Sequence, residues 1–169
     1  PFTFDWDSPG TTPVTTGGAV QTGNNTVGAQ PLGSTGNYFT VGPANVSPPT
    51  SSPGFINLAS FGAIGSISFL WGSVDDYNTL TVIDRLGNAI AGATFTGLSV
   101  TNPANGNQVN PGTNPIVTLT ITGADQLNIG GLRLASTQQA FEVDNFRIVA
   151  VPEPTTWALL ILGFGAIGY

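Results

Sequence analysis

Apolar and polar residues alternate along most of residues 1–150, and this period of two constrains the fold more than any other feature of the chain. Segment 2–7 alternates Phe, Phe and Trp with Thr, Asp and Asp, and segment 116–122 carries Thr at every second position. Such alternation is typical of strands that bury one face and expose the other. Because no segment with helical spacing separates these strands, we expect an all-β fold.

The alternating segments are short and are separated by stretches rich in Gly, Pro, Asn and Thr. Strands are expected at 2–7, 38–41, 55–59, 65–71, 78–84, 88–96, 98–101, 116–122, 127–134 and 140–149. Gly87 and Asn88 favour a hairpin between 78–84 and 88–96, because both tolerate positive φ. Strands at this spacing predict an antiparallel β-sandwich, jelly-roll-like, spanning residues 1–150. We also expect the first and last strands to lie side by side.

The composition excludes several classes of function. The net charge is −6, with three Arg and no Lys, so the chain lacks the clustered basic residues of a nucleic-acid-binding surface. No Cys is present for disulfides or thiol chemistry, and no His is present as a general base or zinc ligand. The chain opens directly on a strand-like segment, as expected of a secreted chain after removal of a signal peptide.

Paired carboxylates are the remaining route to catalysis, since two of them can hydrolyse glycosidic bonds. The acidic residues considered are Asp75, Asp76, Asp84, Asp125, Glu142 and Asp144. Their spacing selects no acid and nucleophile, and acidic residues in loops and at edges also serve to solubilise a surface of low charge. We therefore expect that the chain is not an enzyme.

The C-terminal segment differs in character from everything before it. A stiff linker at 151–154 leads into residues 155–169, which carry no charge and are expected to form a hydrophobic helix. Residues 157–169 would reach roughly 20 Å at 1.5 Å per residue, which is short of a ~30 Å bilayer core. Lipid or neighbouring copies should cover its large side chains, which are Trp157, Leu159, Leu160, Ile161, Leu162, Phe164, Ile167 and Tyr169.

Pro152, Glu153 and Pro154 are followed, after two spacer residues, by Trp157 and Ala158, and these residues precede the apolar run. This arrangement resembles the PEP-CTERM sorting signal of Gram-negative bacteria, in its PEPxxWA variant. The family's signal ends in an Arg-rich cluster, whereas this sequence stops at Tyr169. The resemblance implies recognition by an exosortase-type sorting enzyme, a transient membrane anchor, and a place at the cell surface or in the extracellular matrix. Segments 2–7 and 141–147 are also similar to strands that bracket many PEP-CTERM ectodomains and jelly-roll carbohydrate-binding modules.

Two kinds of function follow from these features. Uncharged strands rich in Thr, Asn and Gly, together with the apolar tail, favour a structural protein whose copies form homo-oligomers or polymers, such as a filament. The alternative is a module that binds polysaccharide without catalysis, using an exposed aromatic ring as a stacking platform. Tyr77, beside Asp75 and Asp76, is the best surface candidate, whereas Trp6 and Trp71 continue apolar faces and are expected in the core.

Calcium is the only inorganic partner that the sequence suggests, and no other cofactor is expected. If the terminal strands are neighbours, oxygen ligands could converge from both of them. These ligands would be Asp5, Asp7, Glu142, Asp144 and Asn145. Alternate residues point to opposite faces of a strand, which limits how many of them can share one ion.

Overall fold

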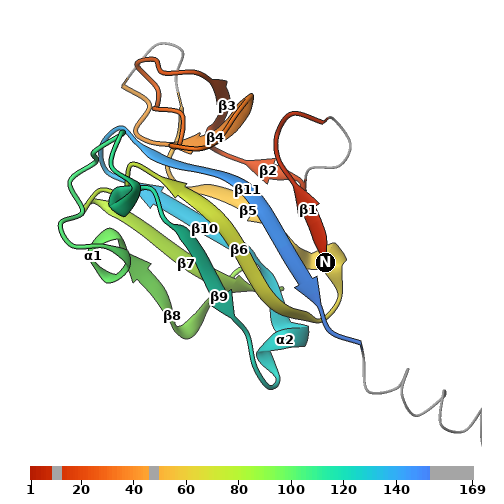
Figure 1. Cartoon of the computed structure of the whole chain (residues 1–169). Helices are drawn as coiled ribbons and strands as arrows, with labels where there is room; N and C mark the ends of the chain where they lie inside the picture. Colours follow the sequence, from red (N-terminus) through yellow and green to blue (C-terminus); the bar gives the residue numbers. More distant parts are fainter. Residues whose placement is uncertain (9–12, 46–49, 153–169) are drawn as a thin grey trace, which may run out of the picture.

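The computed structural model describes residues 1–8, 13–45 and 50–152, which form two antiparallel sheets (Figure 1). The first sheet has the order β3 (Ala19–Thr22), β4 (Asn37–Val41), β11 (Phe141–Ala150), β6 (Ile64–Gly72) and β9 (Ile116–Thr120), with β1 (Phe2–Phe4) also paired to β11. The second sheet has the order β2 (Thr15–Thr16), β5 (Gly54–Asn57), β10 (Ile129–Ser136), β7 (Asn78–Asp84) and β8 (Ala89–Thr96). The expectation of an all-β chain is confirmed.

The pairing of the terminal strands agrees with the sequence pattern. β1 runs antiparallel to β11, with Phe2 opposite Ile148 and Phe4 opposite Phe146. The hairpin of β7 and β8 is also present. Figure 1 shows the N-terminus beside the end of β11, where the chain leaves the sheet. The first and last strands are therefore antiparallel neighbours in the first sheet.

The strand expected at 98–101 is wrong, because residues 98–100 belong to the helical turn α1 (Gly97–Val100) and Thr101 caps its C-terminus. The Thr101 N–H donates to the Gly97 carbonyl at 3.0 Å, and the Ser99 hydroxyl donates to the Thr96 carbonyl at 2.6 Å. Gly97 also lies so close to the Asp75 carbonyl that a Cβ would sit 2.0 Å from that oxygen. These local hydrogen bonds take the place of strand pairing, since this segment does not pair with another strand in the described part of the chain.

The remaining short helices lie in connections. A second helical turn, α2 (Asp125–Asn128), precedes β10, so that strand begins later than expected. The 3-10 turns η1 (Ala59–Phe61) and η2 (Pro111–Thr113) lie within loops. Asn110 caps η2 by accepting the Gly112 N–H at 2.9 Å.

The core lies between the two sheets and is dominated by stacked aromatic rings. Phe146 stacks on Phe4 at 4.8 Å and on Phe69 at 4.9 Å between ring centroids. Trp71 stacks on Phe141 at 4.2 Å. Aliphatic residues of both sheets, such as Ile67 of β6 and Leu132 of β10, belong to the same buried cluster. The expectation that Trp6 and Trp71 lie in the core is confirmed, since they are 8% and 0% exposed.

A β-bulge in β11 lets both halves of this strand face the core. Asp144 lies opposite Leu70 and Arg147 opposite Ser68, so two residues of β11 face the single residue between them on β6. Asn145 occupies the bulge with φ 53°, a conformation that Asn tolerates better than most residues. The extra residue puts Val143 and Phe146 on the same face, which simple alternation would not allow.

Asn145→Val should destabilise the domain by about 1–2 kcal/mol, because a β-branched residue is unfavourable at positive φ. Asn145→Gly is the matched control, since glycine adopts this conformation readily. Urea unfolding of both variants, compared with the parent chain, measures the difference. Equal stability of the Val and Gly variants would contradict the role assigned to the left-handed bulge residue.

The predicted sorting and assembly segment lies largely outside the described residues. Only Pro152 of its sorting motif falls within them, whereas Glu153, Pro154, Trp157, Ala158 and the apolar residues up to Tyr169 do not. Within residues 1–8, 13–45 and 50–152, no helix has the length and apolar character needed to cross a membrane.

Candidate functional site

One end of the first sheet buries polar side chains on its outer face, away from the core. Segment 23–36 lies over this area, which we call the covered polar face and which consists of Tyr38, Thr40, Glu142 and Asp144. The exposed fractions of these four residues are between 0% and 2%. Buried polar groups require partners, so the bonds that each makes indicate what the site can do.

Backbone groups of the covering segment satisfy the first two residues. The Tyr38 hydroxyl donates to the Gly23 carbonyl at 2.9 Å, and the Thr40 hydroxyl donates to the Val27 carbonyl at 3.3 Å. Burial raises the pKa of Tyr38, and the charge of Glu142 raises it further. These two side chains therefore hold the segment in place and stay neutral.

Both oxygens of the Glu142 carboxylate accept a hydrogen bond. Its Oε1 accepts the Ala29 N–H and its Oε2 accepts the Ser73 hydroxyl, each at 2.9 Å. Burial raises the pKa of Glu142 to about 7, the two hydrogen bonds oppose this change, and the nearby Asp75 charge adds to it. Each oxygen thus has one protein partner, and the place of Glu142 in the expected calcium site stays a prediction.

Asp144 differs from Glu142 in the hydrogen bonds of its two carboxylate oxygens. Oδ2 accepts the Ser34 hydroxyl at 2.5 Å, whereas the buried Oδ1 has no hydrogen-bond partner in the described part of the chain. Burial raises the pKa of Asp144; the bonds from Ser34 and the Asn145 backbone lower it, and the charges of Asp5 and Asp7 raise it.

The other residues expected to bind calcium are Asp5 and Asp7, which lie near Asp144, and Asn145, which is exposed. Asp5 and Asp7 follow β1 and lie close enough for their charges to act on Asp144. Asn145 is exposed at the bulge. Among residues 1–8, 13–45 and 50–152, no three His, Cys, Asp or Glu side chains form a group that could hold a metal ion. The structure thus brings Asp5 and Asp7 toward Asp144 without closing a set of three ligands.

Tyr77, the residue expected to stack on sugars, is half-buried and bonded through its hydroxyl. That oxygen lies 2.6 Å from Asp75 Oδ2 and 2.8 Å from the Gln139 carbonyl. Burial raises the pKa of Asp75, although the bond from Tyr77 opposes this. The polar tip of Tyr77 is therefore already used within the protein, and only its ring could contact a ligand.

The carboxylates considered for catalysis lie in different parts of the fold. Asp84 ends β7 and accepts the Leu86 and Asn88 N–H groups at 2.8 Å each, bonds that lower its pKa. Asp125 belongs to α2. These positions suit turn formation, and they place neither residue beside Glu142 on the covered polar face.

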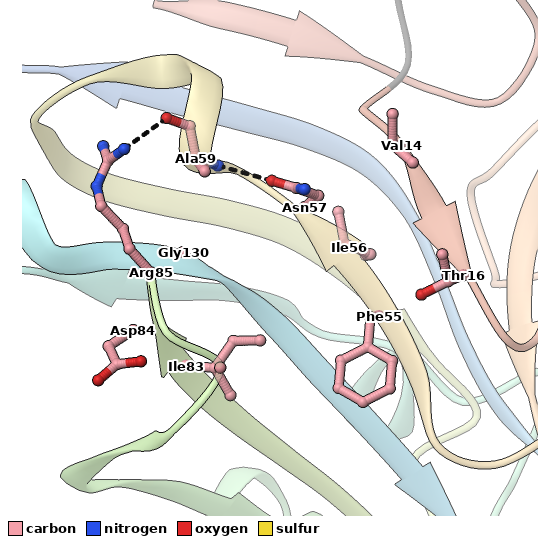
Figure 2. A pocket seen from close by; sticks show the side chains of 11 residues that line it. Val14, Thr16, Phe55, Ile56, Asn57, Ala59, Ile83, Asp84, Arg85 and Gly130 are labelled. Carbon is pink, nitrogen blue, oxygen red and sulfur yellow. Dashed lines mark hydrogen bonds between the residues drawn. The ribbon is translucent and has the colours of Figure 1, made fainter.

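A small open pocket of about 210 Å³ lies on the second sheet, where β5, β7 and β10 meet (Figure 2). Phe55 and Ile83 supply apolar side chains, and Gly130 also lines the pocket. The Arg85 guanidinium turns toward the pocket rim and donates to the carbonyls of Leu127, Ala59 and Gly62 at 2.8, 2.9 and 3.2 Å. The pocket thus pairs one half-buried aromatic ring with an arginine already bonded to the backbone.

No protein-family model, no curated protein and no solved structure matches this chain. The function must therefore be argued from the fold and from these sites.

The free energy of unfolding of the parent chain should fall between pH 4.5 and about 7, and Glu142→Gln should make this fall smaller. The pKa of Glu142 is raised in the folded chain, so its contribution is complete below pH 4.5 and is lost as the pH rises to about 7. This loss is about 3 kcal/mol in the parent chain, and glutamine cannot ionise.

Urea unfolding of the parent chain and the Gln variant at about pH 5 and about pH 8 measures how much the free energy of unfolding changes with pH in each. Asp75 and Asp144 also have raised pKa values and keep the same sign of pH dependence in both proteins. An unchanged difference between the two pH values in the Gln variant would show that Glu142 does not titrate in this range.

Proposed function

We propose that this chain is a secreted structural protein of the surface or extracellular matrix of a Gram-negative bacterium, and that its copies associate with one another. In this proposal the two sheets form a jelly-roll sandwich that acts as a building block. Residues 155–169 serve as the sorting segment and take part in a subunit contact or in the transient membrane anchor. The resemblance of residues 152–158 to the PEP-CTERM signal supports the sorting route.

The observation that carries the proposal is the edge strand β9. It ends the first sheet, and its five residues include no charged residue and no proline. Ile116 is 74% exposed, and Thr118 and Thr120 are exposed on the same face. Natural edge strands are usually protected by charges, prolines or bulges, because free edges pair with other chains. β9 pairs with β6 without a register shift, so it has none of these protections.

The backbone of β9 offers hydrogen-bonding groups to a partner. Trp71 N–H donates to the Pro115 carbonyl and Ile121 N–H donates to the Gly65 carbonyl, so the odd-numbered residues face β6. In an antiparallel ladder the alternate residues direct their N–H and C=O groups to the other side. The backbone groups of residues 116, 118 and 120 therefore point away from β6, where a strand of a second copy can pair.

Apolar grooves beside β9 add contact area to such an edge. Two pockets of about 310 and 300 Å³ lie between β8 and β9. Their walls include Ile90 and Phe95 of β8 and Val117 of β9, which are only partly buried. A second copy paired to β9 could cover these side chains, which adds a hydrophobic contribution to the backbone bonds.

Thr120→Pro should weaken self-association at least about tenfold, because one lost backbone bond and a disturbed edge cost about 1.4 kcal/mol or more. The substitution removes an outward N–H and leaves the bonds to β6 intact. Sedimentation velocity over a range of concentrations measures the association of the full chain.

Thr120→Val is the matched control, because valine keeps the N–H and suits a strand. A chain lacking residues 155–169 tests the contribution of the tail. Association that is the same in the parent, the Pro variant and the shortened chain would contradict both contacts, and a monomeric parent would contradict the proposal as a whole.

A carbohydrate-binding module is the second candidate, and the pocket of Figure 2 favours it. Phe55 lines this pocket beside the exposed Thr16 and Asn57, a combination of a ring and polar groups that suits a sugar. Tyr77, the residue first suggested for this role, has its hydroxyl bonded internally.

If this alternative holds, Phe55→Ala should abolish most binding on a glycan array, since losing the burial of this ring against a ligand costs about 1.5–3 kcal/mol. Tyr77→Phe keeps the ring but removes the hydroxyl, and it should bind as the parent does. Binding that survives Phe55→Ala would exclude the pocket as the sugar site, and an array without signal for the parent would exclude this function.

A further inference from the structure

Asp144 holds a buried carboxylate oxygen that nothing in the described part of the chain explains. The residue is 0% exposed, and its Oδ1 has no hydrogen-bond partner there. Within the described ranges, Trp6 Nε1, Trp71 Nε1 and Gln139 Oε1 are also buried without partners, but of these four side chains only Asp144 can carry a charge. Native proteins supply a partner to buried charged groups, because leaving them uncompensated is unfavourable.

The neighbours of Asp144 increase the negative charge around this oxygen. Asp144 is bonded to Ser34, and Asp7 accepts the Asn37 N–H at 2.5 Å, so the turn at 34–37 holds both carboxylates. Gly36 makes room for Asp7, since a Cβ there would lie 2.1 and 2.2 Å from the two carboxylate oxygens. The Asp7 N–H in turn donates to Asp5 Oδ1 at 3.1 Å.

We infer that Asp144 Oδ1 is a ligand of a calcium ion bound near Asp5 and Asp7, where β1, β11 and the turn at 34–37 meet. Among the described residues, no three acidic side chains form a group that could hold a metal ion, so an ion bound here would need further ligands from hydroxyl or carbonyl oxygens and from water. Calcium accepts six to eight oxygen ligands in flexible geometry, whereas magnesium demands a near-ideal octahedron. Calcium therefore fits this irregular set of oxygens better.

The ion would join three segments that are far apart in the sequence. It would add a further link between the segment after β1, the covering segment and the last strand, which hydrogen bonds such as that from Ser34 to Asp144 already join. If calcium binds the folded chain and not the unfolded chain, the free energy of unfolding rises with the logarithm of the calcium concentration once the site is saturated. The inference is independent of the proposed self-association, because all these ligands belong to one chain.

The experiment uses the full chain, first equilibrated with a chelator and then titrated with calcium chloride. Isothermal titration calorimetry should show one ion per chain, and the thermal midpoint should rise with calcium concentration. Extracellular calcium modules bind with dissociation constants of about 10⁻⁴ to 10⁻³ M. No heat and no change in thermal midpoint up to about 10 mM calcium would overturn the inference.

Substitutions test which residues bind the ion. Asp144→Asn and Asp7→Asn should each weaken calcium binding by at least about tenfold. Asp125→Asn is the control, since it removes one exposed acidic charge from α2 and should leave the affinity unchanged. Calcium affinity of Asp144→Asn equal to that of the parent would overturn the assignment and would leave a proton or a water as the partner of Oδ1.

Terbium luminescence keeps the test decisive if Asp144→Asn does not fold. Trp6 lies between Asp5 and Asp7 in the sequence, so its excitation should sensitise a terbium ion bound by the parent chain. Calcium should displace the bound terbium, and so reduce the emission, at a lower concentration than magnesium does. Absence of sensitised emission, or displacement by magnesium ahead of calcium, would contradict a calcium site at these residues.

Discussion

The extra residue in β11 is the constraint on which the rest of the structure depends. Without the bulge at Asn145, alternation would turn Phe146 away from the core that Phe141 and Val143 already face. Phe146 is the centre of the aromatic stack, since it contacts rings of both β1 and β6. The bulge therefore sets the pairing of the first strand with the last as well as the packing between the two sheets.

The same strand also supports a second buried layer on its other side. Because Glu142 and Asp144 precede the bulge, they share the outer face with Tyr38 and Thr40 of β4, where segment 23–36 covers them. Hydrogen bonds join each of these four side chains to the covering segment. Its stability therefore depends on the charge state of its carboxylates, whereas the core between the sheets does not. β11 thus contributes both to an apolar core, whose side chains do not titrate, and to a polar layer whose stability depends on pH.

The sequence was sufficient to predict the all-β fold, the neighbouring terminal strands, the β7–β8 hairpin and the burial of Trp6 and Trp71, because each depends on a local pattern. It was not sufficient for α1, where the apolar pattern of a strand gives way to the contact of Gly97 with the distant Asp75. The covered polar face was missed because a charged residue in an alternating strand predicts exposure. The partners of Glu142 lie 113 and 69 residues away in the sequence, and no local signal marks them.

The place of β11 inside its sheet has a mechanical consequence. The chain continues toward residue 153 directly from this strand, which has hydrogen-bonded neighbours on both sides. Ladder bonds lie perpendicular to the strands, so tension applied at the end of β11 acts across them as shear. Bonds to β1, β4 and β6 share that load at the same time, instead of opening one after another as they would on a peeled edge. A load applied through residue 152 would therefore act on a strand that is hydrogen-bonded on both sides.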